Sequence, residues 1–223
     1  MTTMLQLAQT LACTEAEGPG RRFAIWFQGC PLRCVECCNP EMLPFSGGSP
    51  MSVASVVEEI FSAREQFDIE GITLIGGEPF AHAAGAAALA REVRAAGLTV
   101  MVFSGYTIEA LREQRDEHVA ALLRETDLLV DGRFEKDQPD SERRWIGSAN
   151  QRIHFLTDAY SPDDQRWREN DTLEIRWDGS QILINGFPAT DAKALWKPGM
   201  LQPKRKPGNE IRAAERHATE NPE

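Results

Sequence analysis

The chain has 223 residues, of which 42% are hydrophobic and 26% are charged, which is enough for one domain with a sizeable core and ordinary for a globular protein. Its net charge of -10 argues against nucleic acid as the main partner, because phosphates repel an acidic surface. No stretch approaches the roughly 20 apolar residues of a membrane span, and the first residues lack a basic signal-peptide segment, so we expect a cytoplasmic protein with no membrane partner.

Strand and helix patterns alternate along the first 130 residues, after a modest apolar run that ends at a Gly-Pro-Gly turn near residue 20. Continuous apolar runs predict buried strands at residues 23–27, 72–75, 98–103 and 128–130. Amphipathic or alanine-rich patterns predict helices that begin near residue 52 and that cover residues 81–96 and 107–125. Such alternation with short loops is typical of a parallel sheet with right-handed crossovers, although periodicity alone leaves open whether the sheet curves into a barrel.

The alternation stops after residue 135. A short strand is expected at 153–156, and two alternating segments around Asp178-Gly179-Ser180 predict a β-hairpin at 172–177 and 181–185. From about residue 197 the chain is rich in Pro, charged residues and Asn, which predicts a disordered tail. We therefore expect a core at 15–156, a β-rich extension at 157–196 and a tail at 197–223.

Three of the five cysteines lie within eight residues, directly after the first predicted strand, as Cys30, Cys34 and Cys37. Thiolates with this C-x3-C-x2-C spacing can converge on one metal centre, but three of them leave a tetrahedral zinc ion or a four-iron cluster one ligand short. Structural metal sites usually close their coordination shell, whereas sites that act on a substrate keep one position open. The odd number of cysteines and the lack of a secretory signal favour metal binding over disulfides.

Three other motifs also follow predicted strands: the Gly-Gly-Glu-Pro sequence at 76–79, Ser104-Gly105-Tyr106, and Asp131-Gly132-Arg133. Because the carboxyl ends of parallel strands meet at one edge of a sheet, all four motifs should face one cleft. Glycines let the backbone approach a ligand, and a carboxylate or carbonyl there can accept from an ammonium group. The structural alternatives are an ordinary turn at 76–79, a helix-capping hydroxyl at Ser104, and an ion pair involving Asp131.

Together these motifs resemble those of radical S-adenosylmethionine (SAM) enzymes. More narrowly, five segments are similar to the activating-protein family of anaerobic ribonucleoside-triphosphate reductase, namely residues 17–21, 27–30, 39–40, 130–134 and 147–151. The resemblance covers roughly residues 15–156. C-x3-C-x2-C on its own is moderate evidence, and Gly-Gly-Glu-Pro one strand later makes it strong.

The resemblance implies an incomplete parallel (βα) barrel of the radical SAM type, here with a C-terminal β-hairpin extension. It implies that Cys30, Cys34 and Cys37 bind three irons of a 4Fe-4S cluster, with SAM on the fourth. One electron then cleaves SAM to methionine and a 5'-deoxyadenosyl radical, which removes a hydrogen atom from a glycine of a partner glycyl radical enzyme. A flavodoxin- or ferredoxin-like protein would donate the electron. The expected cofactor-binding residues are Glu36, Cys38, Gly76, Gly77, Glu78, Pro79, Ser104 and Asp131.

Two residues depart from the family pattern, which more often has Gly or an aromatic residue in place of Glu36 and His, Tyr or Phe in place of Cys38. Neither change removes a ligand, although Cys38 could in principle replace its neighbour Cys37. Two other functions stay open at this point. One is a radical SAM enzyme for another protein, peptide or small molecule, and the other is a non-catalytic iron-sulfur or zinc module, which leaves residues 76–79 unexplained.

Overall fold

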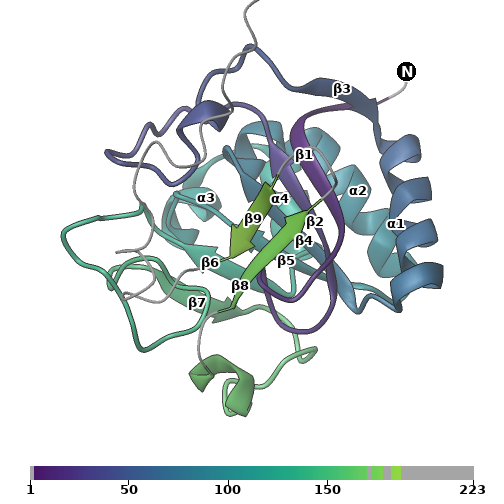
Figure 1. Cartoon of the computed structure of the whole chain (residues 1–223). Helices are drawn as coiled ribbons and strands as arrows, with labels where there is room; N and C mark the ends of the chain where they lie inside the picture. The colour runs from purple at the N-terminus through teal and green to yellow at the C-terminus, as the bar shows by residue number, and fades with distance from the viewer. Residues whose placement is uncertain (1–2, 170–171, 178–181, 187–223) are drawn as a thin grey trace, which may run out of the picture.

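The computed structural model describes residues 3–169, 172–177 and 182–186. Its centre is an open seven-stranded sheet in the order β3-β1-β2-β4-β5-β6-β7 (Figure 1). Four neighbouring strands are parallel: β2 (Arg22–Phe27), β4 (Gly71–Gly76), β5 (Thr99–Phe103) and β6 (Leu128–Asp131). Antiparallel strands flank them, namely β1 (Met4–Thr14), β3 (Ser49–Ser52) and β7 (Arg152–Phe155). The predicted parallel α/β core is confirmed, as a sheet whose two edge strands do not meet within the described residues.

Four helices lie behind the sheet in Figure 1 and cover one of its faces. They are α1 (Val53–Phe67), α2 (Ala83–Ala95), α3 (Ile108–Glu113) and α4 (Glu117–Arg124), and 3-10 turns occur at η1 (Pro40–Met42), η2 (Pro79–His82) and η3 (Gln165–Arg168). Helix α1 begins where the sequence predicted, because the Ser52 hydroxyl accepts a hydrogen bond from the Ser55 amide at 3.0 Å. Gly97 follows α2 with φ +81, the left-handed conformation that glycine adopts without strain.

Each face of the sheet has its own apolar core. On the helical face, alternate side chains of β2 such as Phe23, Ile25 and Phe27 pack with α1 and α2. On the other face, residues after β6 return across the sheet, and Trp145 and Trp167 pack with strand residues from β5 and β6. Burial of one large apolar side chain contributes about 1.5–3 kcal/mol, so both faces help to hold the parallel strands in register.

The prediction of one helix over 107–125 is wrong, because the chain breaks at Gln114 and restarts. Gln114 is extended, with ψ 121, and the Asp116 carboxylate then accepts from the amides of His118 and Val119 to cap α4. A short acidic side chain competes with helix continuation by bonding the backbone locally, which favours a new helix start.

Strands β1 and β3 were not predicted from the sequence. In β1 the register shifts between Leu7 and Gln9, and such an irregularity destroys the period-two pattern by which strands are recognised. The segment of β3 contains Pro50 and was expected to be irregular. It forms the outermost strand of the sheet, where the missing amide of proline is tolerated.

The predicted hairpin is confirmed as β8 (Leu173–Trp177) paired with β9 (Ile182–Gly186). It lies in front of the sheet in Figure 1, on the side away from the helices. The rest of the expected extension, 187–196, and the expected tail, 197–223, lie outside the described residues. Within the described residues, no helix has the length and apolar character needed to cross a membrane.

Candidate active site

The cysteine loop begins where β2 ends, at the carboxyl edge of the parallel strands. Backbone hydrogen bonds from Gly29 to the Met42 carbonyl (2.8 Å) and from Cys30 to the Leu43 carbonyl (3.0 Å) fix its first residues. The backbone turns into the left-handed region at Arg33 (φ 49) and at Glu36 (φ 53), once between each pair of predicted ligands. The loop therefore makes a tight bend directly before Cys34 and another directly before Cys37.

All five cysteines are free thiols. Cys30 is buried, and burial raises the pKa of its thiol. The pKa of the Cys37 thiol is lowered to about 6, first because the neighbouring Cys38 thiol donates a hydrogen bond to it. Among the described residues, no three Cys, His, Asp or Glu side chains stand together as a formed metal site. The donor set nonetheless fits an iron-sulfur cluster, because Cys30, Cys34 and Cys37 offer three soft sulfur ligands, none of them in a disulfide, on one short loop.

The Gly-Gly-Glu-Pro motif lies directly against the start of the cysteine loop. Gly77 donates to the Phe27 carbonyl at 2.8 Å and Glu78 donates to the Gly29 carbonyl at 3.0 Å, which extends the β2–β4 pairing beyond the strands. A Cβ atom on Gly77 would lie 2.3 Å from the Gly29 carbonyl oxygen, so only glycine fits there. The sequence expectation that the two motifs share one edge is confirmed.

The Glu78 carboxylate joins the ends of two strands. It is 1% exposed and accepts three hydrogen bonds, from the amides of Phe80 (3.0 Å) and Gly105 (2.9 Å) and from the Ser104 hydroxyl (3.0 Å). Gly105 in turn packs against Leu32 of the cysteine loop, since a Cβ there would lie 2.4 Å from a Leu32 methyl carbon. Three of the four strand-end motifs thus meet in one contact network built on a single carboxylate.

Burial raises the pKa of Glu78 from 4.5 to about 7, despite the three donors that favour the charged form. Between these pH values the folded protein holds a proton on Glu78 that the unfolded chain releases. The contribution of Glu78 to the free energy of unfolding is therefore largest at low pH and declines as the pH rises toward 7. At about 1.4 kcal/mol per pKa unit, this amounts to roughly 3 kcal/mol.

A Glu78→Gln variant cannot titrate and should lose this part of the decline. We expect its unfolding free energy to fall by roughly 3 kcal/mol less than that of the wild type between pH 5 and pH 8. Urea titrations at both pH values measure the difference. Glu17, whose pKa burial also raises to about 7, leaves a residual slope in the variant. If the unfolding free energy depends on pH equally in the wild type and the variant, the raised pKa of Glu78 is contradicted.

Asp131, at the end of β6, lies at the same edge but faces α3 and β7. Its carboxylate is fully buried and accepts from the Ile108 amide at 2.7 Å, while it pairs with Arg152 at 2.6 Å and His154 at 3.0 Å. Burial alone would raise its pKa, but the Arg152 guanidinium, the Ile108 amide and His154 together hold that pKa below the usual value. Asp131 thus makes an ion pair, with Arg152 as the partner.

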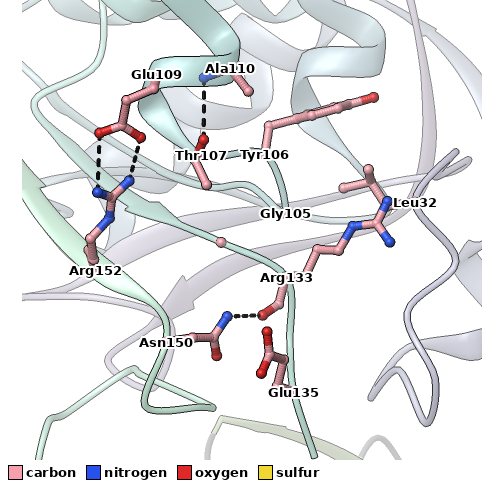
Figure 2. A pocket seen from close by; sticks show the side chains of 11 residues that line it. Leu32, Gly105, Tyr106, Thr107, Glu109, Ala110, Arg133, Glu135, Asn150 and Arg152 are labelled. Atoms are coloured by element: carbon pink, nitrogen blue, oxygen red, sulfur yellow. Dashed lines mark hydrogen bonds and ion pairs between the residues drawn. The ribbon is translucent and has the colours of Figure 1, made fainter.

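A cavity of about 610 Å³ opens between the cysteine loop and the ends of β5 and β6 (Figure 2). It is lined by residues from four segments, namely Leu32, Gly105, Tyr106, Thr107, Glu109, Ala110, Gly132, Arg133, Glu135, Asn150 and Arg152. Arg152 is neutralised by Glu109 as well as by Asp131. The Arg133 guanidinium extends toward Leu32 in Figure 2 and has no charged partner among the described residues. Among the described residues that line the cavity, Arg133 is therefore the basic side chain left to pair with a ligand, while the Glu135 carboxylate lines the same cavity.

Glu36 and Lys136 form an ion pair beside this region, and sequence reasoning found only Glu36. Glu36 pairs with Lys136 at 2.5 Å, which ties the cysteine loop to the segment after β6. Asn150 donates to the Arg133 carbonyl at 2.7 Å and Gln151 to the Gly132 carbonyl at 3.0 Å, so these amides satisfy backbone groups after β6. Lys136 gave no signal because its partner is 100 residues away in the chain.

Comparisons with known proteins agree with this geometry. Residues 16–154 match the family described as 4Fe-4S single cluster domain. The chain is also 32% identical over 147 residues to the anaerobic ribonucleoside-triphosphate reductase-activating protein of Vibrio cholerae, a match that covers 63% of this chain and 91% of that protein. It belongs to this activating-protein family.

The Escherichia coli (strain K12) member of the activating-protein family is 30% identical over 146 residues, covering 62% of this chain and 91% of that protein. The cluster expected from the cysteine loop is confirmed as a 4Fe-4S cluster by the family match. A solved structure, QueE from Escherichia coli, has 18% identity and a TM-score of 0.37 over 47% of this chain and 53% of that one. The family match ends before β8 and β9, so the hairpin lies outside it.

Proposed function

We propose that this protein reductively cleaves SAM at a 4Fe-4S cluster and removes a hydrogen atom from a glycine of a partner enzyme related to anaerobic ribonucleotide reductase. The observation that supports this most is the placement of an open three-thiol loop beside Gly-Gly-Glu-Pro and a ligand-sized cavity. The relatives named as activating proteins supply the substrate class.

Cys30, Cys34 and Cys37 hold the cluster. When bound, the reduced cluster supplies the electron that breaks a carbon–sulfur bond of SAM. Cys30 is buried and would shield its side of a bound cluster from water, whereas the half-buried Cys34 and Cys37 would leave the cluster accessible. The cavity bordered by Leu32 of the same loop would admit an outside ligand.

Residues of the cavity and of the Gly-Gly-Glu-Pro motif would hold SAM. Gly76 and Gly77 lie beside the cysteine loop, where their backbone carbonyls could accept from the ammonium group of bound SAM. Glu78 follows these glycines and would fix their position, because its carboxylate is already bound by three donors. Arg133 offers the unpaired charge that suits a carboxylate. Glu36, Cys38, Pro79, Ser104 and Asp131 complete the proposed cofactor-binding set.

An open sheet suits a macromolecular substrate. Strands β3 and β7 leave the sheet unclosed, so a loop of another protein can approach the carboxyl edge, whereas a small substrate is usually enclosed on most sides. The chain's residues would act mainly by orienting the glycine C–H next to the reacting atom and by excluding water.

The electron donor is, in this proposal, a flavodoxin- or ferredoxin-like protein that docks on the outside of the cysteine loop, where Val35 is 74% exposed. The five free thiols suit the reducing cytoplasm. Neither nucleic acid nor a membrane has a role in the proposed reaction.

Replacement of Arg133 by Met should weaken SAM binding. We expect the KM for SAM to rise about 10- to 100-fold with a smaller effect on kcat, because a charge-assisted contact of about 1.5–3 kcal/mol is lost. An Arg112→Met variant is the matched control, since Arg112 lies on α3 outside this cavity. A KM change below threefold in the Arg133 variant would contradict the role.

Anoxic reconstitution with iron and sulfide, followed by dithionite and SAM, tests the proposed chemistry. The expected products are methionine and 5'-deoxyadenosine, with a protein-bound glycyl radical once the reductase is added. If zinc is the only metal bound and no 5'-deoxyadenosine forms, the chain is a non-catalytic metal module instead. Cleavage of SAM without a glycyl radical would assign the chemistry to another target.

A further inference from the structure

The C-terminal hairpin presents its apolar side to solvent. Ile175 pairs with Ile184 and Trp177 with Ile182, so these four side chains lie on one face of the two-stranded ribbon. Trp177 is 68% exposed, Ile175 65% and Ile182 44%. We call these four residues the hairpin face. A two-stranded ribbon is marginal in water by itself, and an exposed apolar patch on it is a feature of interaction sites.

Polar residues on the opposite side of the hairpin hold it to the protein. The Glu174 carboxylate accepts from the Glu15 amide at 2.8 Å, and the Asn185 amide donates to the Thr14 hydroxyl at 2.8 Å. The Gly186 amide donates to the buried Glu17 carboxylate at 2.9 Å. The hairpin is thus attached to the protein through polar contacts, and the hairpin face is exposed and available to bind another surface.

The order of these contacts sets the direction of the hairpin. Glu174 meets residue 15, whereas Arg176 donates to the carbonyl of Cys13, so β8 runs opposite to β1. Strand β1 is itself antiparallel to β2, and Thr14 lies opposite Arg22 at the amino end of β2. Strand β8 therefore points toward the carboxyl edge, where the cysteine loop and the cavity lie, and its most exposed residue, Trp177, is at that end.

The size and position of the hairpin face select among possible occupants. Two five-residue strands present on the order of 200 Å², far less than the roughly 800 Å² per partner of a stable dimer, so a second copy of this chain would be held too weakly. Strand β9 ends at Gly186, near Glu17, at the end of the hairpin away from the carboxyl edge. The hairpin face is too small to bind a protein stably by itself. A protein that also inserts a loop into the cavity makes a second contact, and the two contacts together increase its affinity.

We infer that the hairpin face is a docking surface for the protein substrate. It binds an apolar patch of the partner enzyme while a loop of that enzyme enters the cavity. The inference rests on the proposed function. It gives the extension beyond the family match a role in substrate choice, because the hairpin adds affinity without touching the reacting atoms.

The test measures binding of the cluster-loaded full chain to the anaerobic ribonucleotide reductase of the same organism under anoxic conditions. Trp177→Ser should raise the Kd about 10-fold, as expected for an exposed aromatic anchor, and an Ile175→Thr/Ile182→Thr double variant, which keeps β-branched side chains, should act in the same direction. Phe61→Ser, on α1 at 37% exposure, is the matched control and should leave Kd unchanged. Formation of 5'-deoxyadenosine without the reductase should stay unchanged in all three.

Acrylamide quenching of Trp177, obtained as the difference between wild type and Trp177→Phe, should be high in the free full chain and should fall when the reductase binds. Protection of Trp177 in the free chain would assign the hairpin face to residues 187–223 or to a second copy and overturn the inference. So would equal Kd values in the wild type and both hairpin variants, or no binding of the reductase at all. A wild type that fails to cleave SAM contradicts the proposed function separately.

Discussion

A Cys34→Ala variant should bind little iron and should form no detectable 5'-deoxyadenosine. Removal of the middle one of the three proposed ligands leaves two on a loop that bends twice. The expected loss is of cluster content first and of activity as a consequence. Iron and sulfide analysis, together with visible absorbance after anoxic reconstitution, measures the first effect independently of turnover.

Cys13→Ala provides the control for this experiment. Cys13 is also a half-buried free thiol, but it lies on β1 and packs against the helical core. Its variant should keep full iron content. A Cys38→Ala variant should also keep its iron, since Cys38 is not one of the assigned ligands. Retention of iron and SAM cleavage by Cys34→Ala would show that the ligand assignment is wrong.

Replacement of Arg22 by Met should lower the unfolding free energy by about 3–5 kcal/mol. The Arg22 side chain is 0% exposed and its guanidinium donates to Thr73 at 2.7 Å, to Thr99 at 3.1 Å and to Tyr160 at 3.0 Å. These contacts join β2, β4, β5 and the segment after β7 at the amino end of the sheet. Methionine fills the space but leaves buried oxygen atoms without a donor.

Arg21→Met is the matched control, because it removes the same charge one residue away. Arg21 pairs with Asp68 at 2.8 Å, but Asp68 is 89% exposed and such surface pairs contribute about 0–1 kcal/mol. In urea unfolding, the loss of unfolding free energy should therefore be severalfold larger for Arg22→Met than for Arg21→Met. A loss below about 1 kcal/mol for Arg22→Met would mean that water or rearranged side chains replace its hydrogen bonds.

The parallel strands and the cysteine loop could be predicted because their signals are local. Buried parallel strands appear as continuous apolar runs, and ligand spacing is a property of eight consecutive residues. Ser52 marked the start of α1 for the same reason. In contrast, the helix break at Gln114 depends on a single competing cap, and β1 is hidden by a register shift, so neither produces a periodic pattern.

The site itself could be predicted only as a set of motifs at one edge. That Glu78 bridges the Phe80 and Gly105 amides is a consequence of distances between strands, which no sequence spacing encodes. The pairing of Asp131 with Arg152 likewise depends on the antiparallel register of β6 and β7. The C-terminal hairpin was predicted from the sequence, but which of its two faces is exposed depends on its contacts with Thr14 and Glu17.

Isotope transfer from substrate to product tests the central claim most directly. The reductase is produced with deuterated glycine and mixed anoxically with the reduced, cluster-loaded protein and SAM, and the 5'-deoxyadenosine is then analysed by mass spectrometry. We expect the product to gain deuterium from the glycine α-position in proportion to the glycyl radical formed. Product that remains unlabelled, in the same yield with and without the reductase, would contradict hydrogen abstraction from a glycine of this partner.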